Sequence, residues 1–203
     1  MRITIIGGSR GTGARLAEKA SAAGHEVTVL SRSGAAPDGV RSIRGSATDP
    51  DAARTAVTGA DAVVVTVGGA KGVRRHRAAV TRTIIDAMQD QGVRRLVVQS
   101  SLGAGDSGSQ MPLPLRVLMK ALLATALADH DEQEAAVRQS GLDWTVVRPT
   151  GLTNKPGTGH WQALEVGEAG TLRGSVPRDD VAACILRVLE DGSTIGKALG
   201  VSS

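Results

Sequence analysis

The sequence predicts an α/β protein built on one doubly wound parallel sheet with helices on both faces. Three observations lead to this fold class. Segments with strand and helix periodicity alternate along all 203 residues, a length that suits a single domain. Several strands, such as Ala62 to Val67, are nearly continuous apolar runs, as expected for strands that are covered on both faces. The third observation is a glycine-rich loop that joins the first strand to the first helix.

That loop follows the β-branched run Ile3 to Ile6 and contains Gly7, Gly11 and Gly13. A strand, a glycine loop and a helix in this order form the context of a dinucleotide-binding fingerprint. Gly7 permits the tight turn, Gly11 lets the backbone approach a pyrophosphate, and Gly13 lets the helix pack closely on the strand. The free N–H groups of the helix N-terminus face the phosphates. The loop predicts a Rossmann-type NAD(P)-binding domain, and an ordinary strand–helix connection is the alternative.

The rest of the chain continues the alternation, and we expect residues 1–203 to form one domain. Strands are expected at 2–6, 26–31, 40–44, 61–67, 94–100, 143–148 and 197–201, and helices at 13–23, 50–58, 73–91, 113–127, 130–140 and 178–191. Gly24, Gly92 and Gly141 lie where three of these helices end, as C-capping glycines do. Two segments are predicted to be irregular. They are residues 102–114 and an excursion at about 151–175 on the substrate side of the domain. Ligands of a doubly wound sheet bind beyond the carboxyl ends of its strands, so that edge is the predicted site.

The composition narrows the choice of function. The chain has no tyrosine, which removes one common catalytic acid, and no phenylalanine. Its net charge of +4 comes from arginines scattered among acids, and two tryptophans are the only aromatic residues. A nucleic-acid partner is therefore not expected. The one cysteine, Cys184, lies at apolar helical spacing, which predicts a buried and inert thiol.

No membrane partner is expected either. The longest apolar segment, Leu113 to Ala128, is interrupted by Pro114, Arg116 and Lys120. The chain opens with a strand where a signal peptide would have a charged and then an apolar region. We expect a cytoplasmic protein that is a monomer or a homodimer.

The end of the second strand indicates the choice of cofactor. A site for NAD places an acid there to bind the ribose 2′-hydroxyl, whereas this strand ends in Ser31-Arg32-Ser33. A guanidinium can bind a 2′-phosphate through charge-assisted hydrogen bonds. Arg10 in the glycine loop can reach the same place, and Ser9 and Ser33 add small hydroxyls. These residues favour NADP, unless both arginines are merely exposed.

Taken together, the motifs resemble a known family. They are the glycine loop, Ser100-Ser101, Asp131 to Ala135, Gln139 to Pro149 and Val176 to Ala182. This set resembles the atypical short-chain dehydrogenase/reductases with NmrA-like folds, and most of all the biliverdin reductase B and flavin reductase group. Two features depart from the pattern. The loop Gly7 to Gly13 is similar to that of the tyrosine-dependent branch, and Gly45-Ser46 stands where many relatives have Gly-Asp.

The resemblance implies an NADPH-dependent reductase and, with the strand ends, a set of site residues. The residues expected to bind the cofactor are Gly7, Ser9, Arg10, Gly11, Thr12, Gly13, Arg32, Ser33, Ser46, Ala47, Thr66, Val67, Gly68, Ser100, Pro149, Thr150, Gly151 and Leu152. Ser101 matches a serine near the nicotinamide, and a strand-end hydroxyl bonded to backbone is the alternative. His130 matches a histidine of the substrate pocket, where it donates a proton or orients an acidic substrate. Its alternative is an exposed residue at a helix start. His130 and Glu134 have the spacing of metal ligands, but no further ligand converges on them, so no metal is expected.

Three functions remain open. Without tyrosine, the Tyr–Lys proton relay cannot operate. The leading hypothesis is therefore a reductase that transfers hydride to a flavin, quinone or similar conjugated acceptor. A non-catalytic NADP sensor that binds a partner is the main alternative. Its candidate surface is the apolar excess of helix 115–127, formed by Leu115, Leu118, Met119, Leu122, Leu123 and Leu127. A dimer face or the wall of a lipophilic substrate pocket explains the same excess equally well. A sugar epimerase is the weakest, because the chain is short and lacks tyrosine.

Overall fold

The computed structural model describes residues 1–70, 72–111 and 113–203, and most of its strands belong to one sheet. The eight strands have the order β3-β2-β1-β4-β5-β6-β10-β8. All neighbours are parallel except β10 and β8, which are antiparallel. The strands are β1 (Arg2–Ile6), β2 (Glu26–Ser31), β3 (Arg41–Arg44), β4 (Ala62–Val65), β5 (Arg95–Gln99), β6 (Asp143–Pro149), β8 (Gln162–Glu165) and β10 (Lys197–Ser202). This arrangement confirms the predicted α/β class.

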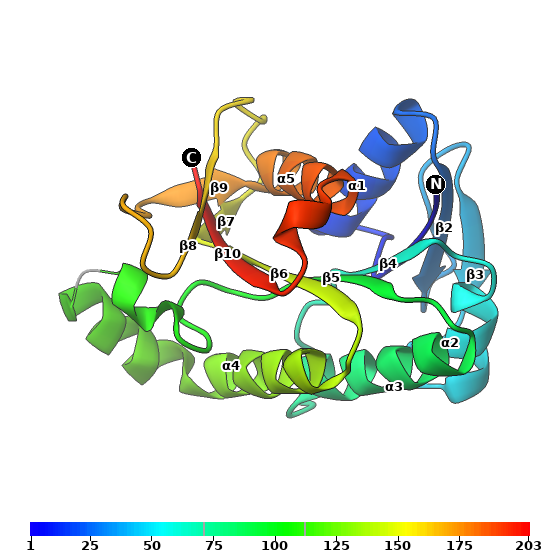
Figure 1. The fold of residues 1–203 in the computed structure, drawn as a ribbon, viewed down its shortest axis with the longest axis horizontal. Helices are drawn as coiled ribbons and strands as arrows, with labels where there is room; N and C mark the ends of the chain where they lie inside the picture. Colours follow the sequence, from blue (N-terminus) through cyan, green and yellow to red (C-terminus); the bar gives the residue numbers. More distant parts are fainter. Residues whose placement is uncertain (71, 112) are drawn as a thin grey trace.

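Helices cover both faces of the sheet (Figure 1). One face carries α1 and α5, and the other carries α2, α3 and α4. Their bounds are α1 (Gly11–Ala22), α2 (Pro50–Val57), α3 (His76–Asp90), α4 (Leu113–Gln139) and α5 (Arg178–Glu190). Two short 3₁₀ helices, η1 (Ser107–Gln110) and η2 (Gly192–Thr194), complete the set. No helix in these described ranges is long and apolar enough to cross a membrane.

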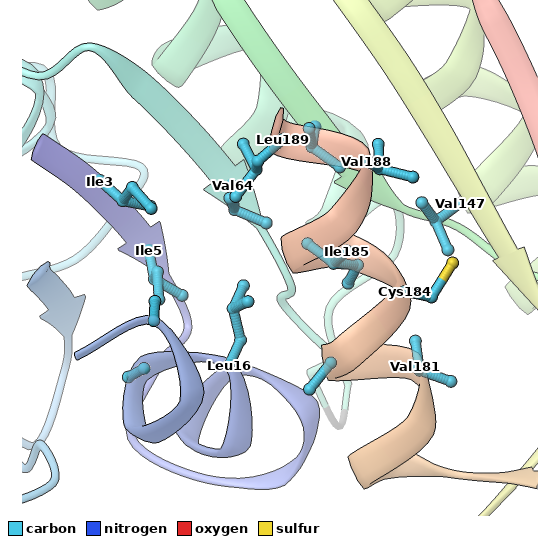
Figure 2. Packing of buried hydrophobic residues seen from close by; sticks show 14 of the residues in the cluster. Ile3, Ile5, Leu16, Val64, Val147, Val181, Cys184, Ile185, Val188 and Leu189 are labelled. Atoms are coloured by element: carbon cyan, nitrogen blue, oxygen red, sulfur yellow. The ribbon is translucent and has the colours of Figure 1, made fainter. Parts of the chain in front are cut away.

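The alternation of side chains along the strands builds two apolar cores. Ile3 and Ile5 of β1 face α1 and α5, whereas Ile6 belongs to the core under α2, α3 and α4. Figure 2 shows the first core, in which Cys184 of α5 lies near Val147. Burial raises the pKa of the Cys184 thiol to about 12, so it stays protonated at neutral pH. The prediction of a buried cysteine is confirmed.

Two of the expected elements need correction. The two helices expected at 113–127 and 130–140 form the two segments of α4, but they meet at a kink at Leu123 (φ −117°, ψ 18°), earlier in the chain than expected. The polar cluster around Asp129 suggested a helix start, but the Asp129 and His130 side chains are buried against the rest of the fold. The excursion at 151–175 is also more regular than expected. It contains β7 (Gly151–Thr153), which pairs in parallel with β9 (Ser175–Pro177), and the sheet-edge strand β8.

Helix α3 begins three residues later than predicted, because its cap comes from a distant residue. Arg75, at the N-cap position, has a left-handed backbone (φ 58°) and gives no side-chain cap. The buried Asp129 carboxylate of α4 instead accepts hydrogen bonds from the backbone N–H groups of Arg77 (3.2 Å) and Ala78 (3.0 Å). It also binds the Arg77 guanidinium at 3.1 Å. One side chain therefore joins α4 to the start of α3.

Asp129→Ala should lower the free energy of unfolding by about 1–3 kcal/mol, because it removes a helix cap and the partner of a shielded arginine. Urea unfolding monitored by circular dichroism measures this loss. Asp86→Ala is the matched control, since Asp86 lies exposed on α3. It should change the free energy by less than about 0.5 kcal/mol. Equal effects of the two substitutions would contradict the capping role.

Candidate functional site

A cavity of about 1340 Å³ runs along the carboxyl edge of the parallel strands. It is lined by the loops that follow β1, β2, β3, β4, β5 and β6, together with part of α4 and the segment 172–178. Every residue expected to bind the cofactor lines this cavity except Gly13, and so do Ser101 and His130. The topology therefore brings together residues that lie far apart in the sequence, including His76 and Arg77 of α3.

The geometry of the glycine loop explains why its glycines are needed. Gly7 (φ 88°) and Gly11 (φ 65°) have left-handed backbones that other residues adopt only with strain. Gly13 is buried beneath the cavity. A Cβ atom there would collide with the Thr66 hydroxyl and lie only 2.6 Å from the Gly7 carbonyl oxygen. Gly13 thus lets α1 pack directly against the end of β4, which fits the role predicted for it.

The cavity carries positive charge and no described lining residue is acidic. The cationic side chains on its wall are Arg10, Arg32, Arg77, Arg173 and Arg178. Burial and then the positive charge of Arg32 lower the pKa of His76, which lies on the same wall. Arg10 and Arg32 form no ion pair with any described residue. Such a wall attracts anionic ligands.

One end of the cavity is apolar. Beyond Ser101 its wall is formed by Leu102, Met111, Leu123, Ala126, Leu127 and Leu172. The side chains of Leu115, Leu118 and Met119, which belong to the predicted partner surface, lie outside the described ones. Leu127 is buried in this wall, whereas Leu122 is 71% exposed. The predicted apolar excess of α4 is thus divided between the cavity and the surface.

His130 is buried, so the alternative of an exposed helix-start residue is wrong. Its Nδ1 lies 3.2 Å from Gln133 Oε1 and 3.4 Å from the Ser100 hydroxyl. Gln133 donates its own amide N–H to Thr81, so Oε1 of Gln133 accepts, and His130 Nδ1 carries the proton. Burial, followed by the charge of Arg77, lowers the pKa of His130 to about 4. The imidazole is therefore neutral at pH 7.

Beneath His130 lies a buried ion pair that sequence reasoning did not find. Arg148 of β6 is fully buried and binds Glu134 of α4 through Nε (2.9 Å) and Nη2 (2.6 Å). Burial alone would lower the pKa of Arg148, but Glu134 and Asp106 outweigh that effect and raise it. The same Glu134 carboxylate accepts a hydrogen bond from the Ser100 hydroxyl at 2.7 Å. The pair thereby fixes Ser100 at the cavity wall.

Ser101 lies half-buried at the point where the polar and apolar parts of the cavity meet. Its hydroxyl donates to the Leu102 carbonyl oxygen over 3.3 Å. This long bond matches the strand-end alternative and leaves the hydroxyl near the cavity that it lines. Sequence reasoning also missed Arg77, Arg173 and Arg178, whose positions on the cavity wall depend on packing between distant segments.

The residues present fit a nicotinamide dinucleotide. The glycine loop forms a cradle that side chains would fill, and the wall above it is cationic. Two polar atoms of lining residues, Gln99 Oε1 and Thr150 Oγ1, are buried without a hydrogen-bond partner in the described ranges. Buried polar atoms normally have partners, so these two positions suit polar groups of a ligand.

Comparison with known proteins agrees with this fit. A family model described as NAD(P)H-binding matches residues 7–192, and the chain belongs to this family of Rossmann-fold proteins. It is 27% identical over 158 residues to the uncharacterized sugar epimerase YhfK of Bacillus subtilis, which covers 75% of this chain and 68% of that protein. It is 30% identical over 152 residues to the UPF0659 protein YMR090W of Saccharomyces cerevisiae, covering 72% and 64%. The chain thus spans about two thirds of these relatives.

Solved structures show the same fold. ChuY, an anaerobillin reductase from Escherichia coli O157:H7, has a TM-score of 0.82 and 27% identity, covering 99% of this chain and 96% of that one. A short-chain dehydrogenase/reductase from Veillonella parvula, solved in complex with NADP, has a TM-score of 0.86 and 21% identity, covering 100% and 94%. The chain therefore shares the fold of both of these proteins.

The neutral state of His130 should make the protein less stable in acid. The unfolded chain takes up a proton near pH 6.5, whereas the folded chain takes it up only near pH 4. Stability should therefore fall as the pH drops through this window, by roughly 2–3 kcal/mol from this residue. Urea unfolding at several pH values measures the slope. The slope of His130→Gln should be shallower, and equal slopes would contradict the assignment.

Proposed function

We propose that the protein is an NADPH-dependent reductase that transfers hydride to a flat conjugated acceptor such as a flavin, quinone or tetrapyrrole. The observation that carries this proposal is one continuous cavity that joins an acid-free cationic wall to an apolar chamber. The first part suits a phosphorylated dinucleotide, and the second suits an extended apolar ring system. The name of ChuY as an anaerobillin reductase supports an acceptor of this kind.

The chain's own residues supply orientation and exclude water. A bound NADPH would supply the hydride. Gln99 and Thr150 offer unpaired polar atoms near the ends of β5 and β6, where they can fix the orientation of a carboxamide. Ser101 stands between this region and the apolar chamber and can position the acceptor. Holding two reactants in reactive geometry lowers the barrier without any acid–base group.

Protonation of the reduced acceptor is assigned to solvent in this proposal. The described cavity wall has no carboxylic acid, and the chain has no tyrosine. His130 is neutral at pH 7, with its Nδ1 proton bound to Gln133, so it is a poor general acid. His130 therefore acts in positioning, through Ser100 and the acceptor, and hydride transfer needs no side-chain acid.

A cofactor sensor is the second candidate, and one observation favours it. Val117, Leu122 and Leu123 of α4 are exposed at 61%, 71% and 41%, and Leu123 also lines the cavity. Such an apolar group beside a cofactor site suits a partner protein. The name of the relative YhfK suggests sugar epimerisation instead. The apolar chamber and the absence of tyrosine argue against a sugar.

Purified protein should oxidise NADPH when FMN, a quinone or a tetrapyrrole is added, and the loss of nicotinamide absorbance follows the reaction. Ser101→Ala should lower kcat, because the acceptor is held less well, while NADPH affinity stays close to that of the parent. His130→Gln should have a modest effect with FMN. If none of these acceptors is reduced by protein that binds NADPH, the sensor function replaces the reductase.

Arg32→Ala should weaken NADPH binding by roughly tenfold to a hundredfold, because it removes a charge-assisted contact to the 2′-phosphate. The affinity for NADH, which lacks that phosphate, should be almost unchanged. Isothermal titration calorimetry with both dinucleotides measures the difference. Equal losses, or a parent protein that prefers NADH, would contradict the assignment of NADP.

A further inference from the structure

We propose that Arg178 is a phosphate-binding residue that lies across the glycine loop and contacts the pyrophosphate of the dinucleotide. The proposal rests on the dinucleotide part of the proposed function and is independent of the acceptor. Arg178 is the first residue of α5 and is far from the loop in sequence. It belongs to the motif Val176 to Ala182, to which the sequence analysis assigned no contact with the cofactor. Its side chain nevertheless lines the same cavity as Gly11.

The position of Arg178 is defined by its contact with the loop. A Cβ atom on Gly11 would lie 3.8 Å from both Cδ and Nε of Arg178. The aliphatic part of the side chain therefore passes next to Gly11, at the N-terminus of α1. This is the part of the loop that the fingerprint assigns to close approach of the pyrophosphate. Helices α1 and α5 pack against each other, which holds the two residues together.

No acidic side chain of the described residues neutralises the charge of Arg178. Its guanidinium donates through Nη1 to the neutral Asn154 Oδ1 at 2.9 Å, and it has no ion pair with any described residue. The two carboxylates that follow it in sequence are engaged elsewhere. Asp179 binds Lys19 of α1 at 2.9 Å. Asp180 is buried and accepts hydrogen bonds from Thr158 and Gly159. A half-buried arginine on a cavity wall without an anionic partner is suited to a phosphate.

The bond to Asn154 gives the arginine a defined orientation. Asn154 directly follows β7 and also lines the cavity. It uses one donor position of the guanidinium and leaves the others for the ligand. Because a neutral amide does not neutralise the charge, Asn154 positions Arg178 without competing with a phosphate. A dinucleotide held by Arg178 is thereby connected to the segment 151–178, which also contributes Leu172 to the acceptor chamber.

The test compares dinucleotide affinities of Arg178→Gln by calorimetry with NADPH and NADH. Both ligands contain the pyrophosphate, so both should bind roughly tenfold to a hundredfold more weakly. Arg178→Lys, which keeps the charge but loses the fork of donors, should lie between Arg178→Gln and the parent. Asn154→Ala should cause a smaller loss, because the charge remains. Lys155→Gln is the matched control, since it removes one exposed charge from the adjacent residue outside the cavity wall, and it should leave both affinities unchanged.

Three outcomes would overturn the proposal. Unchanged affinities in a folded Arg178→Gln protein would show that the residue does not touch the ligand. A loss confined to NADPH would place Arg178 at the 2′-phosphate instead. An equal loss of affinity in Lys155→Gln would show that the effect comes from the overall positive charge and not from a contact between Arg178 and the ligand. Failure of the parent protein to bind NADPH at all would contradict the proposed function as well, whereas each of the three leaves that function standing.

Discussion

The buried pair of Arg148 and Glu134 is the interaction on which the site depends most. It joins strand β6 to the C-terminal part of α4, and both elements contribute residues to the cavity wall. Removing either partner would leave a charge buried without compensation, which costs several kcal/mol. Asp106 binds the same guanidinium at 2.7 Å and so holds the loop after β5 in place. Ser100 donates to the same Glu134 carboxylate and lies 3.4 Å from His130 Nδ1, so the pair helps to hold both residues at the cavity wall.

Much of the fold could be predicted because local sequence and tertiary environment agree. The strands β1, β2, β4, β5 and β6 contain apolar runs, whereas β3 is mostly polar and exposed. Glycines follow α1, α3 and α4 with left-handed backbones, as predicted for C-capping residues. The parallel topology predicted that ligands bind at the carboxyl edge of the strands, and the predicted site residues lie along this edge. Strands β7, β8 and β9 were missed because they are three or four residues long and polar in part. Their pairing comes from the neighbouring strands, which a single sequence does not reveal.

The burial of the polar residues beneath the cavity could not be predicted, for a different reason. Asp129, His130 and Glu134 lie in a run of charged residues that resembles an exposed helix face. Each is buried because a distant residue supplies its partner: Arg77 for Asp129, Ser100 for His130 and Arg148 for Glu134. Periodicity reports which side of a helix is apolar, but it cannot identify partners that are far away in sequence. Charged residues on a buried face are therefore mistaken for solvent contacts.

The acid-free cavity wall also affects the lifetime of the folded chain. Arg10, Arg32, Arg173 and Arg178 line one cavity and repel one another whenever no anion is bound, and no carboxylate on the described wall offsets that repulsion. An anionic ligand removes this repulsion and binds only the native state, so it shifts the equilibrium away from unfolding. Proteases cleave the unfolded or locally opened chain. The abundance of the protein in a cell would therefore follow the supply of its ligand, even where the rate of synthesis is constant.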